Sequence, residues 1–459
     1  MRKISVLALV LALVMLFIAA CGAGGDTGAP ATSSPEPQAP AADSGDAELP
    51  GSAAAVSITH FWSEEDAAQG DVTAYAFWDQ MKLFIEENPN ITVNQSIMPH
   101  DDYQTVIQAA AAADDLPDVF VMKGSWMENW VTNNLVMPIT DILPALPYYD
   151  KYRDGIFSLA TFRGDIYGIP FQAPTVCSVV YYNAALWAEA GYDTIPDTWE
   201  GIFAASDYFN AQGITTVSFG NRDGWPFNSC YLSTLSSRFT GTDWFWSISN
   251  RDGAAGFTDQ EFVDVLQFAA NLGESGVLNP DFNSITDQQA SDLFAAGLAA
   301  TTINGEWVVP YLITNADEEV LANIRIAIMP QPPVASVGPR NGVADTVGWF
   351  ISLNSKLEGD KLETAKKLIF DVWDEDYSEA RVRAGSEGPH FIDVDRGDIH
   401  PLTQMMLSFS GTYTPVPVWD AILSGVLIET MNTGIQEIMA GTRTPESVVE
   451  ELQAIQAAL

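Results

Sequence analysis

The amino-acid sequence predicts an α/β protein built as two lobes. Segments typical of strands and segments typical of amphipathic helices alternate from residue 56 onward, at a spacing that favours parallel sheets with helices on their faces. The roughly 400 residues after this point exceed what one hydrophobic core usually organises. Hydrophobic residues make up 47% of the chain and aromatic residues 11%, so the sequence can fill two large cores.

The individual elements follow from periodicity and stop signals. Phe77, Met81 and Phe84 recur at helical spacing, and Asn88-Pro89 ends the pattern. The expected elements are a strand at 56–62, a polar loop at 63–70, a helix at 75–87, a strand beginning at 91–94, a helix at 103–113, a strand at 119–122, a helix at 262–272 that ends at Gly273 and Gly276, and a last helix at 445–459.

The beginning of the chain predicts a secretory signal at 1–20. A short cationic start precedes an apolar run, and small residues lead to Cys21. The segment Ile18-Ala19-Ala20-Cys21 resembles a bacterial lipobox, whose cysteine carries the acyl chains that hold a protein on a membrane. A transmembrane anchor is the alternative, but spanning needs about 20 apolar residues and this run is shorter.

The next segment, 21–55, is predicted to be a disordered tether, because it is rich in Ala, Gly, Ser and Pro and has little to bury. The expected location of the folded part is therefore the extracellular face of the cell membrane, with lipid attachment through Cys21.

Charge and cysteine content limit the possible partners. The net charge of −40, from 20 basic and 60 acidic residues, excludes nucleic acid, since the chain repels phosphate and has no basic patch. The acids are scattered, which is typical of a solvated surface; attraction of a cationic ligand is the alternative. Cys177 and Cys230 could pair outside the cell or remain buried thiols, and the sequence leaves both open.

Nine short segments, spread over nearly all of residues 56–459, follow one another in a characteristic order. They are Phe84-Ile85-Glu86-Glu87-Asn88-Pro89-Asn90-Ile91-Thr92-Val93, Leu116-Pro117-Asp118-Val119-Phe120, Gly164-Asp165-Ile166-Tyr167-Gly168-Ile169-Pro170, Tyr181-Tyr182-Asn183, Ala190-Gly191-Tyr192, Pro196-Asp197-Thr198-Trp199-Glu200, Phe294-Ala295-Ala296-Gly297, Thr302-Ile303-Asn304-Gly305-Glu306-Trp307 and Gly441-Thr442-Arg443-Thr444-Pro445-Glu446. Together they resemble the extracellular solute-binding proteins of ABC importers, in the sugar-binding family that includes maltodextrin-binding protein.

This resemblance implies a two-lobed fold like that of periplasmic binding proteins, a Venus flytrap whose hinge the chain crosses more than once. It implies an N-terminal lobe from 56–171 with about 340–388, and a C-terminal lobe from 172–339 with about 389–459. The proline-bounded segment Pro170 to Pro174 is expected to be the first hinge strand, with an ordinary turn as the alternative.

The same resemblance implies a monomeric binding protein without a cofactor. It would grip a carbohydrate between its lobes and deliver it to the permease subunits of an importer. Binding sites at domain interfaces favour this arrangement, because two walls can enclose a small molecule and then separate.

Candidate ligand residues are aromatic rings that cover sugar faces and polar groups that satisfy hydroxyls. Trp307, after Asn304-Gly305-Glu306, occupies a position that stacks on sugar in the family. The chain has 13 Trp, so a core position is the alternative for each candidate. The candidates are Trp62, Glu64, Glu65, Trp126 (beside Lys123), Gln172, Trp225, Asn228, Glu306, Trp307, Trp349 and Trp419.

Other chemistries find little support in the sequence. There is no Gly-x-Ser-x-Gly elbow and no His-Glu-x-x-His zinc helix, and the four histidines are dispersed. Asp393-x-Asp395-x-Gly397-Asp398 faintly resembles a calcium loop, but Gln404 replaces the glutamate that would chelate, which favours a surface turn.

Two alternatives stay open. Glu64-Glu65-Asp66 departs from the pattern expected of a maltodextrin binder, and an acidic cleft with several tryptophans would also suit a polyamine or another cationic ligand. An extracellular glycoside hydrolase would need only two facing carboxylates, which a chain with 60 acids could supply.

Overall fold

The computed structural model describes residues 55–395 and 399–459. The predicted signal at 1–20, the lipidation site Cys21 and the tether up to residue 54 lie outside the described residues, as do Gly397 and Asp398 of the expected surface turn. Within the described part of the chain, no helix combines the length and the apolar character that crossing a membrane requires.

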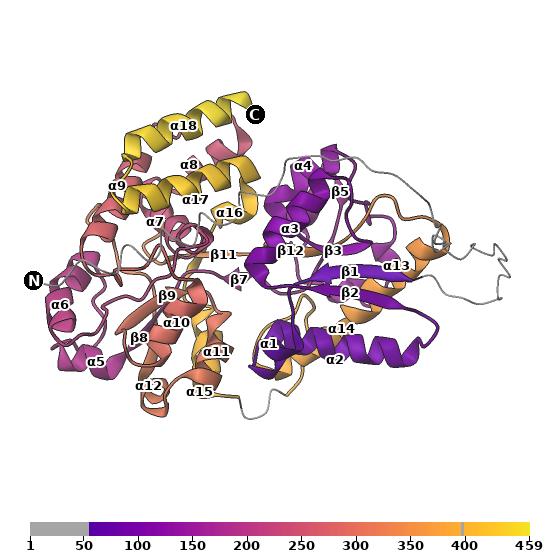
Figure 1. The fold of residues 1–459 in the computed structure, drawn as a ribbon, viewed down its shortest axis with the longest axis horizontal. Coiled ribbons are helices and arrows are strands. Elements are labelled where there is room, and N and C mark those ends of the chain that lie inside the picture. Colours follow the sequence, from indigo (N-terminus) through magenta and orange to yellow (C-terminus); the bar gives the residue numbers. More distant parts are fainter. Residues whose placement is uncertain (1–54, 396–398) are drawn as a thin grey trace, which may run out of the picture. The chain divides into compact units, whose positions relative to one another are not determined.

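The first lobe is built on a five-stranded sheet (Figure 1). Its strands, in spatial order, are β2 (Val93–Ile97), β1 (Val56–His60), β3 (Val119–Lys123), β12 (Trp349–Leu353) and β6 (Ile169–Pro170). Strand β1 runs parallel to β2 and β3, whereas β12 runs antiparallel to β3 and β6. All five residues of β3 are buried, as expected of a central strand covered on both faces.

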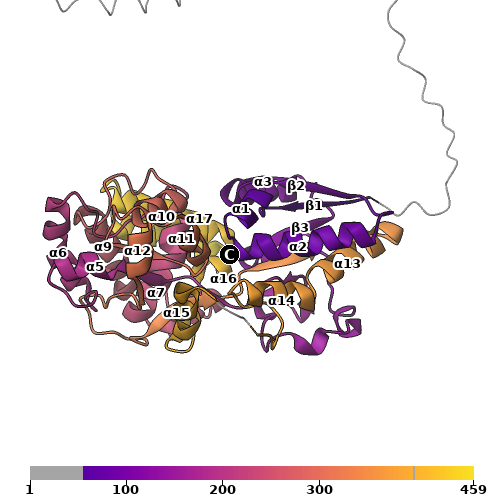
Figure 2. The same ribbon diagram turned by 90° about the horizontal axis from the view of Figure 1, so that it is seen from below.

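Helices surround this sheet, and α2 packs against α13 and α14 (Figure 2). The first lobe contains α1 (Glu64–Ala68), α2 (Val72–Glu87), α3 (His100–Ala112), η1 (Gly124–Trp126), α4 (Met127–Thr132), η2 (Leu143–Ala145), η3 (Tyr149–Lys151), η4 (Ser158–Ala160), the hairpin of β4 (Thr161–Phe162) and β5 (Asp165–Ile166), α13 (Gly359–Val372) and α14 (Glu375–Arg383).

Helix α1 corrects the loop predicted at 63–70. The Ser63 hydroxyl accepts a hydrogen bond from the Asp66 amide, and the Asp66 carboxylate accepts one from the Ser63 amide, which forms a capping box. This reciprocal cap starts the short helix. Hydrophobic burial contributes little to its stability, since none of its residues is buried.

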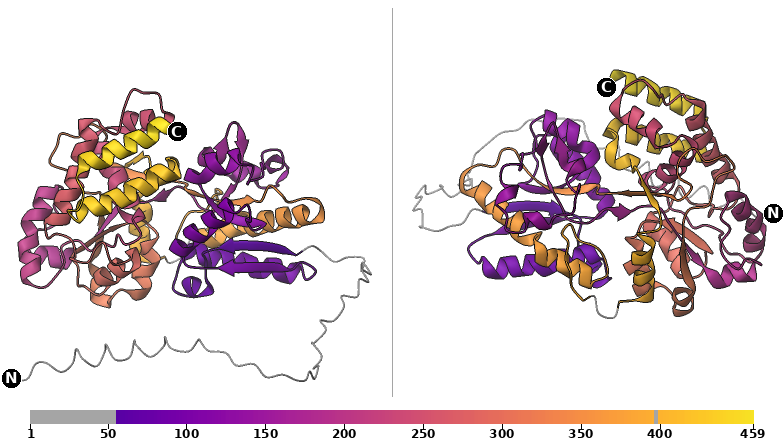
Figure 3. Two further views of the ribbon diagram at one scale, coloured as in Figure 1. Left: turned by 45° about the horizontal axis from the view of Figure 1, so that its top comes forward. Right: turned by 180° about the vertical axis from the view of Figure 1, so that it is seen from behind.

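The second lobe carries an antiparallel sheet of β10 (Ile324–Ala327), β8 (Val179–Asn183) and β9 (Thr301–Asn304). Helices α17 and α18, yellow in Figure 3, lie side by side and pack on α9. The helices of this lobe are α5 (Ala184–Glu189), α6 (Trp199–Ala211), the π-helix η5 (Phe227–Leu232), α7 (Ser233–Phe239), α8 (Thr242–Asn250), α9 (Gln260–Glu274), α10 (Asp287–Ala295), α11 (Val308–Asn315), α12 (Glu318–Asn323), α15 (Pro401–Phe409), α16 (Trp419–Ile422), α17 (Gly425–Met439) and α18 (Pro445–Ala458).

The two lobes have separate hydrophobic cores. The first core draws on residues 56–171 and 347–380, and the cores of the second lobe draw on 176–329, 343 and 402–452. The chain therefore passes between the lobes three times, which confirms the predicted two-lobed α/β fold with a repeatedly crossed hinge.

A small sheet stands at these crossings (Figure 1). It consists of β13 (Thr414–Val416), β11 (Gly342–Thr346) and β7 (Thr175–Val176). Strand β7 follows the predicted hinge segment directly, and β11 leads the chain back toward the first lobe. Cys177 lies beside this sheet as a buried free thiol, and Cys230 is also buried and free, so the two do not form a disulfide.

Candidate functional site

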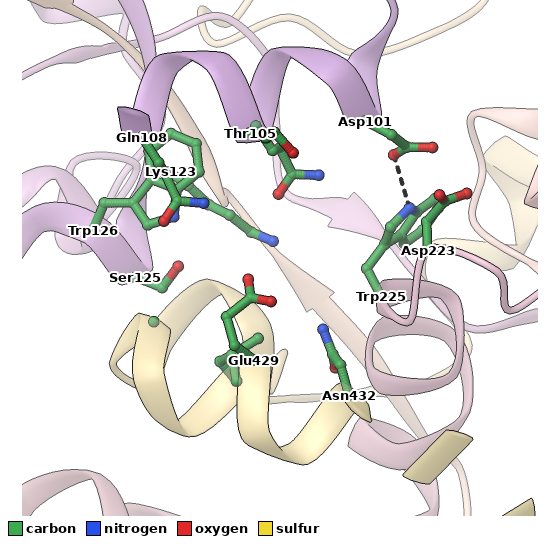
Figure 4. Close-up of a pocket in the computed structure, with 13 residues that line it drawn as sticks. Asp101, Thr105, Gln108, Lys123, Ser125, Trp126, Asp223, Trp225, Glu429 and Asn432 are labelled. Carbon is green, nitrogen blue, oxygen red and sulfur yellow. Dashed lines mark hydrogen bonds between the residues drawn. The ribbon is translucent and has the colours of Figure 1, made fainter. Parts of the chain in front are cut away.

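A cavity of about 170 Å³ has walls from both lobes (Figure 4). The first lobe contributes α3 and the segment after β3, while the second contributes the loop before η5 and the first turns of α17. The lining residues are Asp101, Gln104, Thr105, Gln108, Lys123, Ser125, Trp126, Asp223, Trp225, Gly425, Ile428, Glu429 and Asn432.

Helix α3 presents a polar stripe to the cavity because its opposite face is anchored in the core. Tyr103 and Ile107 are buried one turn apart. The Tyr103 hydroxyl donates to the Val121 carbonyl at 2.6 Å and accepts from the Val121 amide at 2.8 Å, which fixes α3 against β3. The cavity-lining residues Asp101, Gln104, Thr105 and Gln108 recur at the spacing of one helix face.

The carboxyl end of β3 supplies the opposite part of the first-lobe wall. In open α/β sheets, sites form outside the carboxyl ends of the strands. Lys123 ends β3, and its ammonium donates to Asp420 Oδ2 at 2.7 Å, joining the two lobes by a buried ion pair. The same ammonium lies 5.4 Å from the ring centroid of Trp349.

Aromatic rings form a continuous chain from one lobe to the other. In the first lobe, Trp126 and His100 each meet Trp349 edge-on, with ring centroids 5.5 and 5.4 Å apart. His100 in turn lies 5.9 Å from Trp225 of the second lobe, and Trp225 lies 5.9 Å from Trp307. The Trp225 indole N–H also donates to Asp101 Oδ1 at 3.1 Å, a direct bond between the lobes.

Carboxylates dominate the electrostatics of this cavity. Burial raises the pKa of Asp101, but the hydrogen bond and the charge of His100, 2.9 Å away, outweigh burial and hold that pKa below its usual value. Burial raises the pKa of the neighbouring Asp223. The two carboxyl groups interact with each other across the junction between α3 and the second lobe.

Two further acids lie at the end of β9. Burial, followed by the charge of Asp345, raises the pKa of Glu306 to about 7. Burial raises the pKa of Asp287 to about 6, against the opposing hydrogen bonds that Asn304 donates to both its oxygens at 3.0 Å. Among residues 55–395 and 399–459, no three His, Cys, Asp or Glu side chains are grouped as a metal site would require.

Comparison with known proteins gives the family of this chain. The model of a family described as bacterial extracellular solute-binding protein matches residues 79–382. The chain belongs to that family of solute-binding proteins. A Brucella abortus (strain 2308) protein named as a binding protein is 22% identical over 388 residues, which cover 82% of this chain and 88% of the relative.

Solved structures share the fold of this solute-binding protein. A chitin oligosaccharide binding protein superposes with a TM-score of 0.79 at 23% identity, over 89% of this chain and 99% of that one. A structure from work on xylan utilization by Caldanaerobius polysaccharolyticus superposes with a TM-score of 0.77 at 22% identity, over 88% of this chain and 100% of that one.

Several of the residues predicted from sequence gather at the cavity of this solute-binding protein. Trp126 and Trp225 line it, Trp349 lies between them in the aromatic chain, and Trp307 continues that chain beyond Trp225. Asn228 lies behind the lining, where it is fully buried and donates to Asn432 Oδ1 at 3.0 Å.

Two predicted residues lie at the hinge. Gln172 precedes β7 and donates to the Thr175 hydroxyl at 2.6 Å. The amide of Glu306 donates to the Val176 carbonyl at 2.8 Å, which ties the end of β9 to the same strand.

The structure does not bring the remaining predicted residues to the cavity. Trp62 lies in the first core against Phe77 and Phe171, and Trp419 stacks on Phe262 in the second core. Both rings are almost fully buried because neighbouring aromatics cover them.

Glu64 and Glu65 belong to the exposed helix α1. Glu64 pairs with Lys82 at 3.0 Å on the surface, so neither residue lines the cavity. We therefore assign no ligand contact to Trp62, Trp419, Glu64 or Glu65.

Sequence reasoning missed most of the polar lining. The stripe from Asp101 to Gln108 carried a signal, since polar residues at i, i+3, i+4 and i+7 opposed the buried Tyr103. Asp223, Glu429 and Asn432 carried none, because their role depends on a helix and a loop that meet the first lobe only in the folded chain.

Proposed function

We propose that this solute-binding protein captures a sugar or oligosaccharide between its lobes for an ABC importer, without chemical conversion. The observation that carries the proposal is that Trp126 of one lobe and Trp225 of the other line the same cavity. Amide, hydroxyl and carboxylate groups surround the two rings. Indole faces cover the apolar faces of sugars, and the polar groups replace water at the hydroxyls. The names of the chitin oligosaccharide and xylan-related structures support a carbohydrate ligand.

The proposed ligand-binding set is Trp126, Trp225, Trp307 and Trp349, with Asn228, Glu306 and Gln172 in supporting positions. The cavity is smaller than the about 300 Å³ at which typical small-molecule sites begin. We therefore expect the lobes to separate before an oligosaccharide enters, and to close on it.

Tryptophan replacement tests this assignment. Trp225→Ala should weaken carbohydrate binding by about tenfold or more, because it removes a stacking surface and the indole donor. Isothermal titration against a panel of neutral oligosaccharides measures the effect. The matched control is Trp246→Ala, which removes an exposed ring on α8 that does not line the cavity and should leave affinity unchanged.

Two results would contradict the proposal. One is the absence of heat with every carbohydrate in the panel. The other is the release of new reducing ends when the protein is incubated with oligosaccharides, which would indicate a glycoside hydrolase.

We also propose that the protein is a monomer attached to the membrane through Cys21, where it meets the permease subunits. The sequence pattern around Cys21 supports lipidation. Cys21→Ser should move the protein from the membrane fraction to the soluble fraction of expressing cells; retention at the membrane would contradict the anchor.

A further inference from the structure

The cavity carries excess negative charge. Its lining includes the carboxylates of Asp101, Asp223 and Glu429 and the single ammonium of Lys123. That ammonium is already paired with Asp420 at 2.7 Å. Asp101 pairs with His100 at 2.9 Å and Asp223 pairs with Arg222 at 3.1 Å, which leaves Glu429 as the lining acid without a cation among the described residues. Within the described residues, Glu429 makes no hydrogen bond and no ion pair, and Figure 4 shows its carboxylate directed toward the centre of the cavity.

Two nearly buried side chains also direct an unpartnered polar group into this space. Asn432 is 9% exposed; its Oδ1 accepts from Asn228, whereas its Nδ2 meets no acceptor in the described part of the chain and faces the cavity. Ser125 is likewise 9% exposed, and its hydroxyl has no partner among the described residues. Polar side chains that are this little exposed normally have hydrogen-bond partners, so two free polar groups that face one cavity point to a ligand.

We propose that the cavity selects saccharides that carry a protonated amino group, with Glu429 as the principal counter-charge. This inference rests on the proposed function and narrows its ligand class to amino sugars. The ammonium would lie near Glu429 and the Asp101–Asp223 pair, while the Asn432 amide and the Ser125 hydroxyl would bind the neighbouring hydroxyls. Trp126 and Trp225 would cover the ring.

The charge of the ligand decides which class of sugar this cavity prefers. An acidic sugar would place its carboxylate beside that of Glu429, which no cation of the described residues neutralises, and like charges at close range disfavour binding. A neutral sugar could satisfy Asn432 and Ser125 but would leave Glu429 without a cation. A hydrogen bond between charged groups contributes more than one between neutral groups, so the amine should be preferred.

The test compares two ligands with the same sugar backbone, one with free amino groups and one with acetylated amino groups. Wild-type protein is titrated with glucosamine trisaccharide and with its fully N-acetylated form. The amine form should bind at least about tenfold more tightly than the acetylated form. Raising the salt concentration from about 0.05 to about 0.5 M should weaken binding of the amine form and leave binding of the acetylated form unchanged, because salt screens the ion pair. Glu429→Gln should reduce this preference about tenfold.

The control variant is Glu450→Gln on α18. Glu450 is exposed and does not line the cavity, and its replacement changes the net charge of the protein by the same amount. The preference for the amine should be unchanged in this variant. A loss equal to that of Glu429→Gln would indicate an effect of total charge and would overturn the local assignment.

The outcomes separate this inference from the proposed function. If the acetylated form, or another neutral sugar, binds as well as or better than the amine, the inference fails and the carbohydrate function stands. If none of these saccharides binds, both fail. Equal preference in wild type and Glu429→Gln would also overturn the inference.

Discussion

At the residue scale, burial of charge is what distinguishes the region between the lobes. Lys123 and Asp420 form a buried ion pair, which is costly to break because the remaining partner stays desolvated. Glu306 is held near the hinge strand β7 without a cation at hydrogen-bond distance among the described residues. The charges of Lys123 and Asp420 balance each other, whereas the position of Glu306 favours the protonated form of its carboxyl group.

This difference predicts a pH dependence. The pKa of Glu306 is raised from 4.5 to about 7, so the folded state binds its proton more tightly than the unfolded state does. Below pH 4.5 the group is protonated in both states; the destabilising effect of Glu306 grows as the pH rises from 4.5 to about 7 and is complete above that. Glu306→Gln should therefore stabilise the protein by about 1–3 kcal/mol at about pH 8 and by little at about pH 4.

Urea unfolding across this pH range measures that effect. Glu450→Gln is the control, since that exposed residue makes no hydrogen bond or ion pair in the described structure. A Glu306→Gln variant whose advantage is the same at both ends of the range would contradict the buried-carboxyl explanation.

At the scale of elements, glycines set how closely the helices of the second lobe approach. The sequence predicted that the helix at 262–272 ends at Gly273, but Gly273 lies inside α9, which continues to Glu274. A Cβ on Gly273 would lie 2.4 Å from the Met439 carbonyl oxygen of α17. The glycine therefore serves close helix packing, since any larger side chain would collide with backbone.

Gly273→Ala should destabilise the protein by about 1–3 kcal/mol, because α9 and α17 must move apart to admit the methyl group. Thermal or urea unfolding measures this loss. Gly411→Ala is the matched control: no heavy atom lies within 4 Å of its added Cβ, so stability should change little. If both variants unfold alike, close packing is not the reason for Gly273.

At the scale of the whole binding unit, the two lobes meet through few polar contacts. Trp225 bonds Asp101, Lys123 bonds Asp420, and on the surface Arg251 lies 3.1 Å from Glu128. The first two contacts involve cavity-lining residues, so a ligand bound in the proposed site would lie beside both contacts. A ligand that contacts both walls favours the closed state by the difference between its affinities for the closed and open states.

Small-angle X-ray scattering tests this coupling. The carbohydrate that binds most tightly should decrease the radius of gyration of wild-type protein at saturation. Trp225→Ala, which lacks one wall contact and the bond to Asp101, should show a smaller decrease at the same ligand concentration. An unchanged radius in saturated wild-type protein would mean that binding does not require closure.

The sequence by itself determined the features that depend on near neighbours. Phe77 and Phe84 at helical spacing marked α2, which ends at Glu87 before Asn88 as predicted, although Asp71 caps it and starts it at Val72. The alternation of strands and helices indicated α/β, and the family segments predicted two lobes with a shared hinge. Apolar spacing and caps act over a few residues, so they can be read along the chain.

Only the tertiary structure decided which side chains share the cavity. Trp126, which belongs to the first core, also lines the cavity, and so does Trp225, whereas Trp62 and Trp419 lie in the cores and do not line it. Lys123 and Asp420, which join the lobes, lie 297 positions apart. Whether a ring is covered by aromatics or faces a ligand depends on such distant partners, because burial arises from packing between elements and not from the segment that carries the residue.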